Sequence, residues 1–480
     1  MNYIDKIEEN FDQQVKTLQE LISIKSVAED PVMTKDGENY PFGSGVQDAF
    51  AYALDKGKEL GFEAVNIDNY GGHIDFGNGP EVVGILGHLD VVPEGDGWSF
   101  DPYSGAIVDD YIYGRGTTDD KGPVVAALFA MKALKDAGYA PKKTVRLILG
   151  LDEETGWKGM YYYLDRVKAP DYGFTPDADF PALNGEKGIL TFEIAKKFAK
   201  NQLKGLELRS LKGGKAANMV ADTARAVVRA ENMDVYSSIK DMAAEARKET
   251  GHKINIKGVG KSLEITTEGI AAHGATPEAG LNAISIMMNF LGKLNFVNDD
   301  VNDFVGFYND YIGFDLNGDA IGCGLEDEMS GKLTFNVGEV EYTKEAITLT
   351  INVRYPVTAT DDQVYDGILP LINKYNLGII KLKHQKPIYM DPESPMIRAL
   401  MEVYQENTGD KETKPLVIGG GTYARACDNI VAFGAAFPGD PDLMHQKDEK
   451  LSLEKFKLMT KIYADAIYKL TQEDFTIDEQ

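Results

Sequence analysis

The stretch E-V-V-G-I-L-G-H-L-D at residues 81–90 decides the fold. Its first part is apolar and rich in β-branched residues, which predicts a buried strand of a parallel sheet. His88 and Asp90 then lie where the strand ends, at the edge where open α/β sheets build their sites. Side chains two residues apart in an extended segment point the same way, so one can bind a metal while the other orients the imidazole. Taken alone, the pattern fits equally well a capping aspartate beside an unrelated surface histidine.

Composition and charge narrow the class of protein. A chain of 480 residues is too long for one ordinary core, so we expect two or more domains. The net charge of −26 argues against nucleic acid and anionic membranes as partners. There are only two cysteines, no signal-peptide pattern at the N-terminus, and no apolar run near the roughly 20 residues of a membrane span. We therefore expect a soluble cytoplasmic protein.

Acidic side chains follow other predicted elements in the same way. Asp119 and Asp120 lie in a glycine-flanked loop just before an apolar helix, where they could also be simple capping residues. The apolar strand 144–151 runs directly into Asp152-Glu153-Glu154. Three consecutive acids repel one another unless cations are present, although a solvated surface run is the alternative. Asp177 ends a further candidate strand.

The pattern of the chain changes twice and predicts a split domain. Residues 187–385 alternate in the manner of antiparallel strands, with amphipathic helices interleaved. We expect these helices around residues 217–229, 235–249 and 281–294. The first pattern returns after residue 386. The sequence thus predicts an α/β fold in which a catalytic domain (1–186 and 386–480) has a central, mostly parallel sheet flanked by helices. An α+β domain is inserted at 187–385, and its length leaves open whether it holds one subdomain or two.

The polar residues at the predicted strand ends form a candidate metal site. They are His88, Asp90, Asp119, Asp120, Asp152, Glu153, Glu154, Asp177 and His445. Imidazoles and carboxylates without cysteine suit Zn²⁺, Mn²⁺ or Co²⁺, and one shared carboxylate would give a two-metal site. A carboxylate outside the ligand set must then act as general base, and the Glu153-Glu154 pair has one to spare. No G-x-S-x-G motif competes, and the glycine run 419–421 is followed by Thr422 instead of the lysine of a phosphate-binding loop.

Four blocks of sequence resemble the M20 family of di-metal peptidases. They are G-H-L-D-V-V-P at 87–93, G-R-G-T-T-D-D-K-G at 114–122, D-E-E-T-G at 152–156 and M-H-Q-K-D-E at 444–449. The long insert and the A-A-H-G-A-T-P-E block at 271–278 are most similar to the PepV-like, carnosinase-like (Xaa-His) branch of bacterial dipeptidases.

The resemblance implies a role for each of these positions. His88 and Asp177 would bind one metal, Glu154 and His445 the other, and Asp119 would bridge them. Asp90 would orient His88, and Glu153 would be the general base. The peptide bond between Asp119 and Asp120 is expected to be cis. The cofactors would be two divalent ions per subunit, with Zn²⁺ as first choice and Mn²⁺ or Co²⁺ as alternatives.

The resemblance also implies that the inserted domain is a lid. His273, aided by Asn218, would stabilise the oxyanion, and Arg354 would bind the substrate's C-terminal carboxylate. Gly420 and Thr422 would add contacts to the substrate. A long lid that supplies its own histidine makes a monomer plausible and leaves a dimer open.

The expected activity is hydrolysis of dipeptides with free N- and C-termini, by a metal-bridged water that Glu153 activates. An N-acyl-amino-acid deacylase or desuccinylase of the same fold is the alternative. A non-catalytic binding protein would lack a ligand or the base, yet every expected position is filled.

Overall fold

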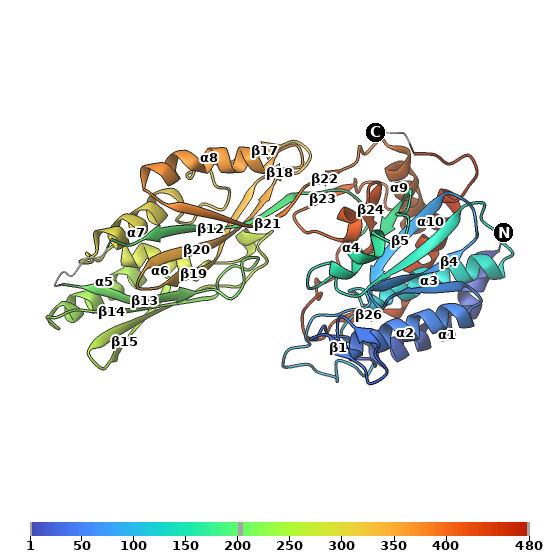
Figure 1. The fold of residues 1–480 in the computed structure, drawn as a ribbon, viewed down its shortest axis with the longest axis horizontal. Helices are drawn as coiled ribbons and strands as arrows, with labels where there is room; N and C mark the ends of the chain where they lie inside the picture. Colours follow the sequence, from blue (N-terminus) through green and yellow to red (C-terminus); the bar gives the residue numbers. More distant parts are fainter. Residues whose placement is uncertain (1, 200–204, 478–480) are drawn as a thin grey trace. The chain divides into compact units, whose positions relative to one another are not determined.

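The computed structural model describes residues 2–199 and 205–477, which form two compact units. Unit 1 comprises the described parts of Met1–Asn184, Met390–Leu416 and Gly421–Gln480. Unit 2 comprises Gly185–Tyr389 and Val417–Gly420. Each unit has its own hydrophobic core. In Figure 1, unit 1 combines the blue and cyan start of the chain with its red end, and unit 2 is drawn in green to orange.

The main sheet of unit 1 is parallel at its centre. Its strand order is β11 (Ala182–Glu186), β24 (Ile430–Phe433), β9 (Tyr172–Thr175), β5 (Val82–His88), β8 (Thr144–Gly150), β4 (Gly71–Phe76) and β3 (Glu63–Ile67). The four strands from β24 to β8 run parallel, as predicted, and every residue of β5 is buried. The outer strands are antiparallel: β11 pairs with β24, β4 pairs with β8, and β3 pairs with β4 through a short hairpin turn.

Helices pack on this sheet and on one another. They are α1 (Tyr3–Ile22), α2 (Ser44–Glu59), α3 (Lys121–Asp136), α4 (Lys158–Leu164), α9 (Pro395–Thr408) and α10 (Leu453–Leu470), with a short 3₁₀ turn η2 (Tyr423–Arg425). The helix α3 is the most deeply buried, because it packs against the sheet, α1 and α10. Its apolar sequence, 124–131, fits that central position. The loop before α3 is therefore fixed at the carboxyl edge of the sheet.

Short strands complete unit 1. A three-stranded sheet joins β6 (Ala106–Val108), β7 (Tyr111–Tyr113) and β26 (Lys450–Ser452). The remaining short pieces of unit 1 are β1 (Val32–Met33), β2 (Asn39–Tyr40), β10 (Ala178–Asp179) and β25 (Ala435–Ala436). β22 (Ile388–Tyr389) and β23 (Leu416–Ile418) lie where the chain passes from one unit to the other, and both pair with β11. The pairing of β26 with β7 brings two loops together, the one that leads to Asp119 and the one that carries His445.

Unit 2 is one α+β unit built on a single antiparallel sheet. The strand order is β15 (Lys253–Val259), β16 (Ser262–Glu268), β14 (Thr223–Arg229), β13 (Glu207–Gly213), β19 (Thr334–Tyr342), β20 (Ala346–Tyr355), β12 (Gly188–Lys197) and β21 (Gly378–Gln385). The other elements are α5 (Val235–Thr250), α6 (Ala283–Leu291), α7 (Asp299–Tyr311), α8 (Asp361–Lys374), η1 (Pro277–Ala279), β17 (Glu326–Asp327) and β18 (Gly331–Lys332). Among the described residues of this unit, eight strands pair in one sheet, a second sheet joins only β17 and β18, and the buried apolar side chains form one core.

The helix predicted around residues 217–229 is wrong. Thr223–Arg229 forms the strand β14, between β13 and β16. Ala224, Ala226 and Val228 are buried, and the residues between them are more exposed. This alternation has the period of a strand, and burial of one face of the strand against the core outweighs the local preference for a helix. Among the described residues, no helix combines the length and apolar character needed to cross a bilayer.

Candidate metal centre

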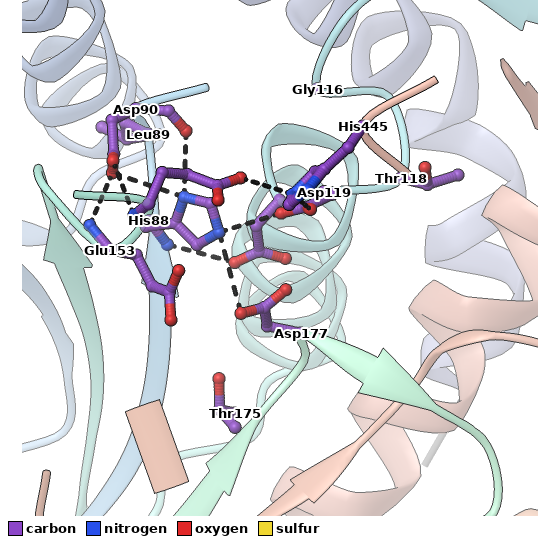
Figure 2. A network of polar contacts seen from close by, with 12 residues as sticks. His88, Leu89, Asp90, Gly116, Thr118, Asp119, Glu153, Thr175, Asp177 and His445 are labelled. Carbon is purple, nitrogen blue, oxygen red and sulfur yellow. Dashed lines mark hydrogen bonds and ion pairs between the residues drawn. The ribbon is translucent and has the colours of Figure 1, made fainter. Parts of the chain in front are cut away.

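The predicted ligands of unit 1 converge at the carboxyl edge of its sheet. His88 is the last residue of β5, and Glu153 and Glu154 follow β8. Asp177 follows β9, and Asp119 lies just before α3. Figure 2 shows the side chains of His88, Asp119 and Asp177 facing one another, with His445 entering from the C-terminal segment. Parallel strands end at one edge, which is why residues so far apart in sequence meet there.

His88 is fully buried, and both of its ring nitrogens are engaged. Its Nδ1 lies 2.9 Å from the main-chain oxygen of Asp90 and 3.4 Å from the Asp90 carboxylate. A proton on Nδ1 leaves Nε2 to face Asp119 Oδ1 at 3.0 Å and Asp177 Oδ2 at 3.7 Å. The carboxylate of Asp90 also accepts the backbone N–H groups of Glu153 and Glu154, each at 3.1 Å. Asp90 thus ties the end of β5 to the acidic loop after β8.

Asp119 lies between the two histidines. One carboxylate oxygen is 3.0 Å from His88 Nε2, and the other is 2.9 Å from His445 Nε2. Glu154 is also 2.9 Å from His445 Nε2. The peptide bond between Asp119 and Asp120 is cis, as the resemblance implies. A carboxylate that offers one oxygen to each of two imidazole groups has the geometry of a bridging ligand.

The cluster carries more negative charge than its present partners neutralise. Burial, followed by the nearby Asp119 carboxylate, raises the pKa of Asp177 to about 7. Burial also raises the pKa of Glu154 and places that of Glu153 well above its usual range. For His445, burial alone would lower the pKa, but hydrogen bonds with Asp119 and Glu154 raise it to about 11. Carboxylates crowded in this way are stabilised in their ionised form by added cations.

The donor set fits divalent cations. Two groups of side chains each have ligand atoms within 4.8 Å of one another: His88, Glu153 and Asp177, and His88, Asp119 and Glu154. His445 adds a second imidazole beside Asp119 and Glu154. Nitrogen and oxygen donors without sulfur suit Zn²⁺, Mn²⁺ or Co²⁺.

Asp120 and Asp152 belong to the supporting structure. Asp120 is buried and accepts the backbone N–H of His88 at 3.1 Å. Asp152 accepts the N–H of Gly159 at 3.0 Å, near the start of α4, and burial raises its pKa to about 6. Neither residue occurs in the two groups of clustered ligand atoms.

The other predicted site residues lie mostly in unit 2, in two places. His273 and Asn218 are on adjacent segments, since Met219 bridges to His273 and the N–H of Gly274 donates to the Asn218 carbonyl at 2.7 Å. Arg354, on β20, donates to Asn352 Oδ1 at 2.9 Å and to the Gly419 carbonyl at 2.8 Å, which places it beside the segment of Gly420. Thr422 belongs to unit 1, where its hydroxyl accepts the N–H of Ala424 at 3.1 Å and caps η2.

Two residues that bear on the site, Arg115 and Glu449, are not among those predicted from the sequence. They form a buried ion pair between the second and fourth sequence blocks, with an N···O distance of 2.7 Å. No local pattern in the sequence distinguishes this pair from the other charged residues of the two blocks, such as Lys121 and Asp448.

Comparisons with known proteins give the family. The model of peptidase family M20/M25/M40 matches residues 84–469. A protein named "Putative dipeptidase" from Staphylococcus epidermidis is 38% identical over 475 residues, which cover 98% of this chain and 99% of that protein. "Putative dipeptidase YtjP" from Bacillus subtilis is 37% identical over 475 residues, with 98% and 100% covered.

A solved structure with the same fold is that of human carnosine dipeptidase 1, with a TM-score of 0.56 and 17% identity over 98% of both chains. The resemblance that the four sequence blocks indicated is thereby confirmed. The chain belongs to peptidase family M20/M25/M40 and is a peptide-bond hydrolase.

Proposed function

We propose that this enzyme is a metal-dependent dipeptidase of broad specificity, which hydrolyses dipeptides with free N- and C-termini. The observation that carries the proposal is the position of Asp119, with one oxygen toward each histidine and Glu154 beside the second. The names of the relatives from Staphylococcus epidermidis and Bacillus subtilis support dipeptides as substrates. We also propose that residues 187–385 are a domain inserted into the catalytic domain and that the enzyme is a monomer. A cytoplasmic location is part of the same proposal, because the two cysteines are free.

We assign two divalent ions to the cluster. His88 and Asp177 would hold the first ion, Glu154 and His445 the second, and Asp119 both, with Asp90 orienting the His88 ring. Zn²⁺ is the first choice for this donor set, with Mn²⁺ and Co²⁺ as alternatives. When bound, such ions lower the pKa of water and polarise the carbonyl of a peptide.

Glu153 is the proposed general base. The side chain of Glu154 is held by His445, whereas that of Glu153 makes no hydrogen bond among the described residues. The backbone of Glu153 is fixed by Asp90, so the carboxylate starts from a defined position. With cations bound beside it the carboxylate is stabilised in its ionised form, so it can take a proton from the attacking water and then give it to the leaving amine.

Unit 2 supplies the proposed contacts to the rest of the substrate. The guanidinium of Arg354 is almost fully buried and is held by Asn352 and Gly419. A guanidinium can bind a carboxylate through two parallel hydrogen bonds, and we assign this role to Arg354 at the C-terminal end of the substrate. Gly420 and Thr422 would add contacts at this end of the substrate. His273, on the segment next to Asn218, would stabilise the oxyanion of the tetrahedral intermediate. Under this assignment unit 2 is the lid.

A panel of substrates tests the proposal. Free dipeptides, tripeptides and N-acetylated amino acids are assayed with Zn²⁺, Mn²⁺ or Co²⁺ present. We expect turnover of several different dipeptides and little turnover of the other two classes. A site that binds both charged ends of the substrate accepts only peptides whose ends are two residues apart. Exclusive activity on N-acyl amino acids would contradict the dipeptidase assignment and favour a deacylase. Turnover of one dipeptide alone would contradict broad specificity.

Removal of metal is expected to abolish turnover and to lower the melting temperature. The carboxylates of the cluster are crowded and buried, so each loses a stabilising charge when the cations leave. The measurement is dialysis against a chelator, followed by a thermal melt and an assay before and after addition of Zn²⁺. At a free metal concentration 100-fold above Kd, the bound ion adds about 2.7 kcal/mol per site. Full turnover in metal-free enzyme would contradict the metal assignment.

A further inference from the structure

A buried ion pair contacts the segments that carry the ligand cluster but supplies none of the clustered ligand atoms. Arg115 is 1% exposed and Glu449 is 0% exposed, and their charged atoms are 2.7 Å apart. Taking two charges out of water is costly unless further hydrogen bonds satisfy them. The partners of these two side chains therefore indicate what the pair does.

Glu449 holds the loop that leads to Asp119. Its carboxylate accepts the backbone N–H groups of Gly116 at 3.1 Å, Thr118 at 2.9 Å and Asp119 at 3.3 Å. It also accepts the hydroxyl of Thr118 at 3.0 Å. Figure 2 shows Gly116 and Thr118 on this loop, next to the segment of His445. One carboxylate thus fixes most of the peptide groups just before the proposed bridging ligand.

Arg115 connects the same loop to two other segments. Its guanidinium donates to the carbonyl of Gln446, the residue after His445, at 3.1 Å. It also donates to the carbonyls of Pro93 at 3.4 Å and Glu94 at 3.5 Å, in the segment that follows Asp90. The pair therefore joins all three segments that carry His88, Asp119 and His445.

His445 needs such support more than the other ligands do. Its side chain is 53% exposed, and its backbone has a φ of 62°, in the left-handed region. Residues 439–444 just before it are mostly exposed or half-buried. Asp119, in contrast, lies at the start of the buried helix α3. A contact between the two loops must therefore set the distance between Asp119 and His445.

We propose that Arg115 and Glu449 are a positioning pair that sets the separation of Asp119 and His445 before metal binds. The affinity of the ion held by His445 then depends on two side chains that do not touch it. This inference rests on the proposed metal site, but it does not depend on which peptide is the substrate.

The test compares Glu449→Gln with the unaltered enzyme in full-length, metal-free protein. Glutamine keeps the shape of the side chain, but it replaces one acceptor oxygen with an N–H donor and removes the charge opposite Arg115. We expect a Zn²⁺ titration by calorimetry to lose about 10–100-fold in affinity at the site completed by His445, as partners of metal ligands typically show. That site is identified with His445→Ala, which removes it. At saturating Zn²⁺ we expect KM to stay unchanged and kcat to recover.

Two further variants distinguish an effect on ligand position from a general loss of stability. Thr118→Val removes one hydrogen bond to Glu449 and is expected to weaken the same site by a smaller factor in the same direction. The matched control is Asp75→Asn, which breaks the ion pair of Arg146 with Asp75, at 2.9 and 2.7 Å, in the same unit. The side chains of that pair form no hydrogen bond or ion pair with the segments of His88, Asp119 and His445 among the described residues, so we expect its loss to leave the Zn²⁺ affinity unchanged.

Hydrogen exchange gives a readout without metal. The amides of Thr118 and Asp119 are expected to exchange faster in Glu449→Gln than in the unaltered enzyme. In Asp75→Asn they are expected to exchange at the rate of the unaltered enzyme. Unchanged exchange together with unchanged affinity in Glu449→Gln would overturn the inference. Equal losses in Asp75→Asn would overturn it too, because the role would then be general stability. If the unaltered enzyme binds no Zn²⁺, Mn²⁺ or Co²⁺, the proposed function fails, and the exchange rates alone decide on the positioning pair.

Discussion

Replacing Glu153 by glutamine is expected to abolish hydrolysis while two metal ions still bind. Glutamine keeps the size of the side chain but cannot take a proton from water. General acid–base groups contribute typically about 10²–10⁴-fold to rate, and the same carboxylate would serve in both proton transfers, so we expect kcat to fall toward the upper end of that range. The measurement is kcat for a dipeptide at saturating Zn²⁺, with bound metal counted by elemental analysis of the same sample.

The neighbouring residue provides the matched control. Glu154→Gln removes a carboxylate from the same acidic loop, but Glu154 Oε1 contacts His445, so this variant should lose bound metal. Glu153→Gln is therefore expected to lose turnover and keep its metal, whereas Glu154→Gln is expected to lose metal. Retained turnover in Glu153→Gln would remove the proposed base. Loss of metal in Glu153→Gln, with full metal content in Glu154→Gln, would exchange the two roles, which the nearness of Glu153 to His88 and Asp177 makes geometrically feasible.

The sequence could predict those residues of the candidate site that lie at the ends of apolar strands. His88, Glu153 and Asp177 each follow an apolar strand, and the parallel order of β9, β5 and β8 brings their ends together. The same reasoning failed for residues 217–229, because alanine and arginine favour a helix in isolation. There the pairing of β14 with the preceding strand β13, and with β16 beyond the helix α5, outweighs local propensity.

The supporting contacts of the site could not be predicted in the same way. Arg115 and Glu449 are 334 residues apart, and nothing near either residue in sequence specifies the other. The resemblance implies that Asp90 orients His88, but it does not indicate that the same carboxylate also accepts the backbone N–H groups of Glu153 and Glu154. Strand ends place the ligands at one edge, whereas the exact separation of the ligands depends on such tertiary contacts.

Arg354→Ala is expected to lower kcat/KM for dipeptides about 10–100-fold, mostly through KM. Hydrogen bonds to charged groups contribute about 1.5–3 kcal/mol, and each 1.4 kcal/mol corresponds to about tenfold in binding. Arg354→Lys should recover only part of the loss, because an ammonium cannot reproduce the two parallel hydrogen bonds of the guanidinium. The measurement is kcat and KM for one dipeptide and for the same dipeptide amidated at its C-terminus.

The amidated substrate isolates the proposed contact from general damage to unit 2. The unaltered enzyme should lose most of its kcat/KM on going from the free to the amidated dipeptide, whereas Arg354→Ala should show little difference between them. The matched control is Arg225→Ala, since Arg225 lies on β14 of the same unit with its side chain 63% exposed. That control should discriminate between the two substrates as strongly as the unaltered enzyme does. An equal loss on both substrates in Arg354→Ala would mean that the guanidinium supports its neighbours Asn352 and Gly419 and that the carboxylate is bound elsewhere.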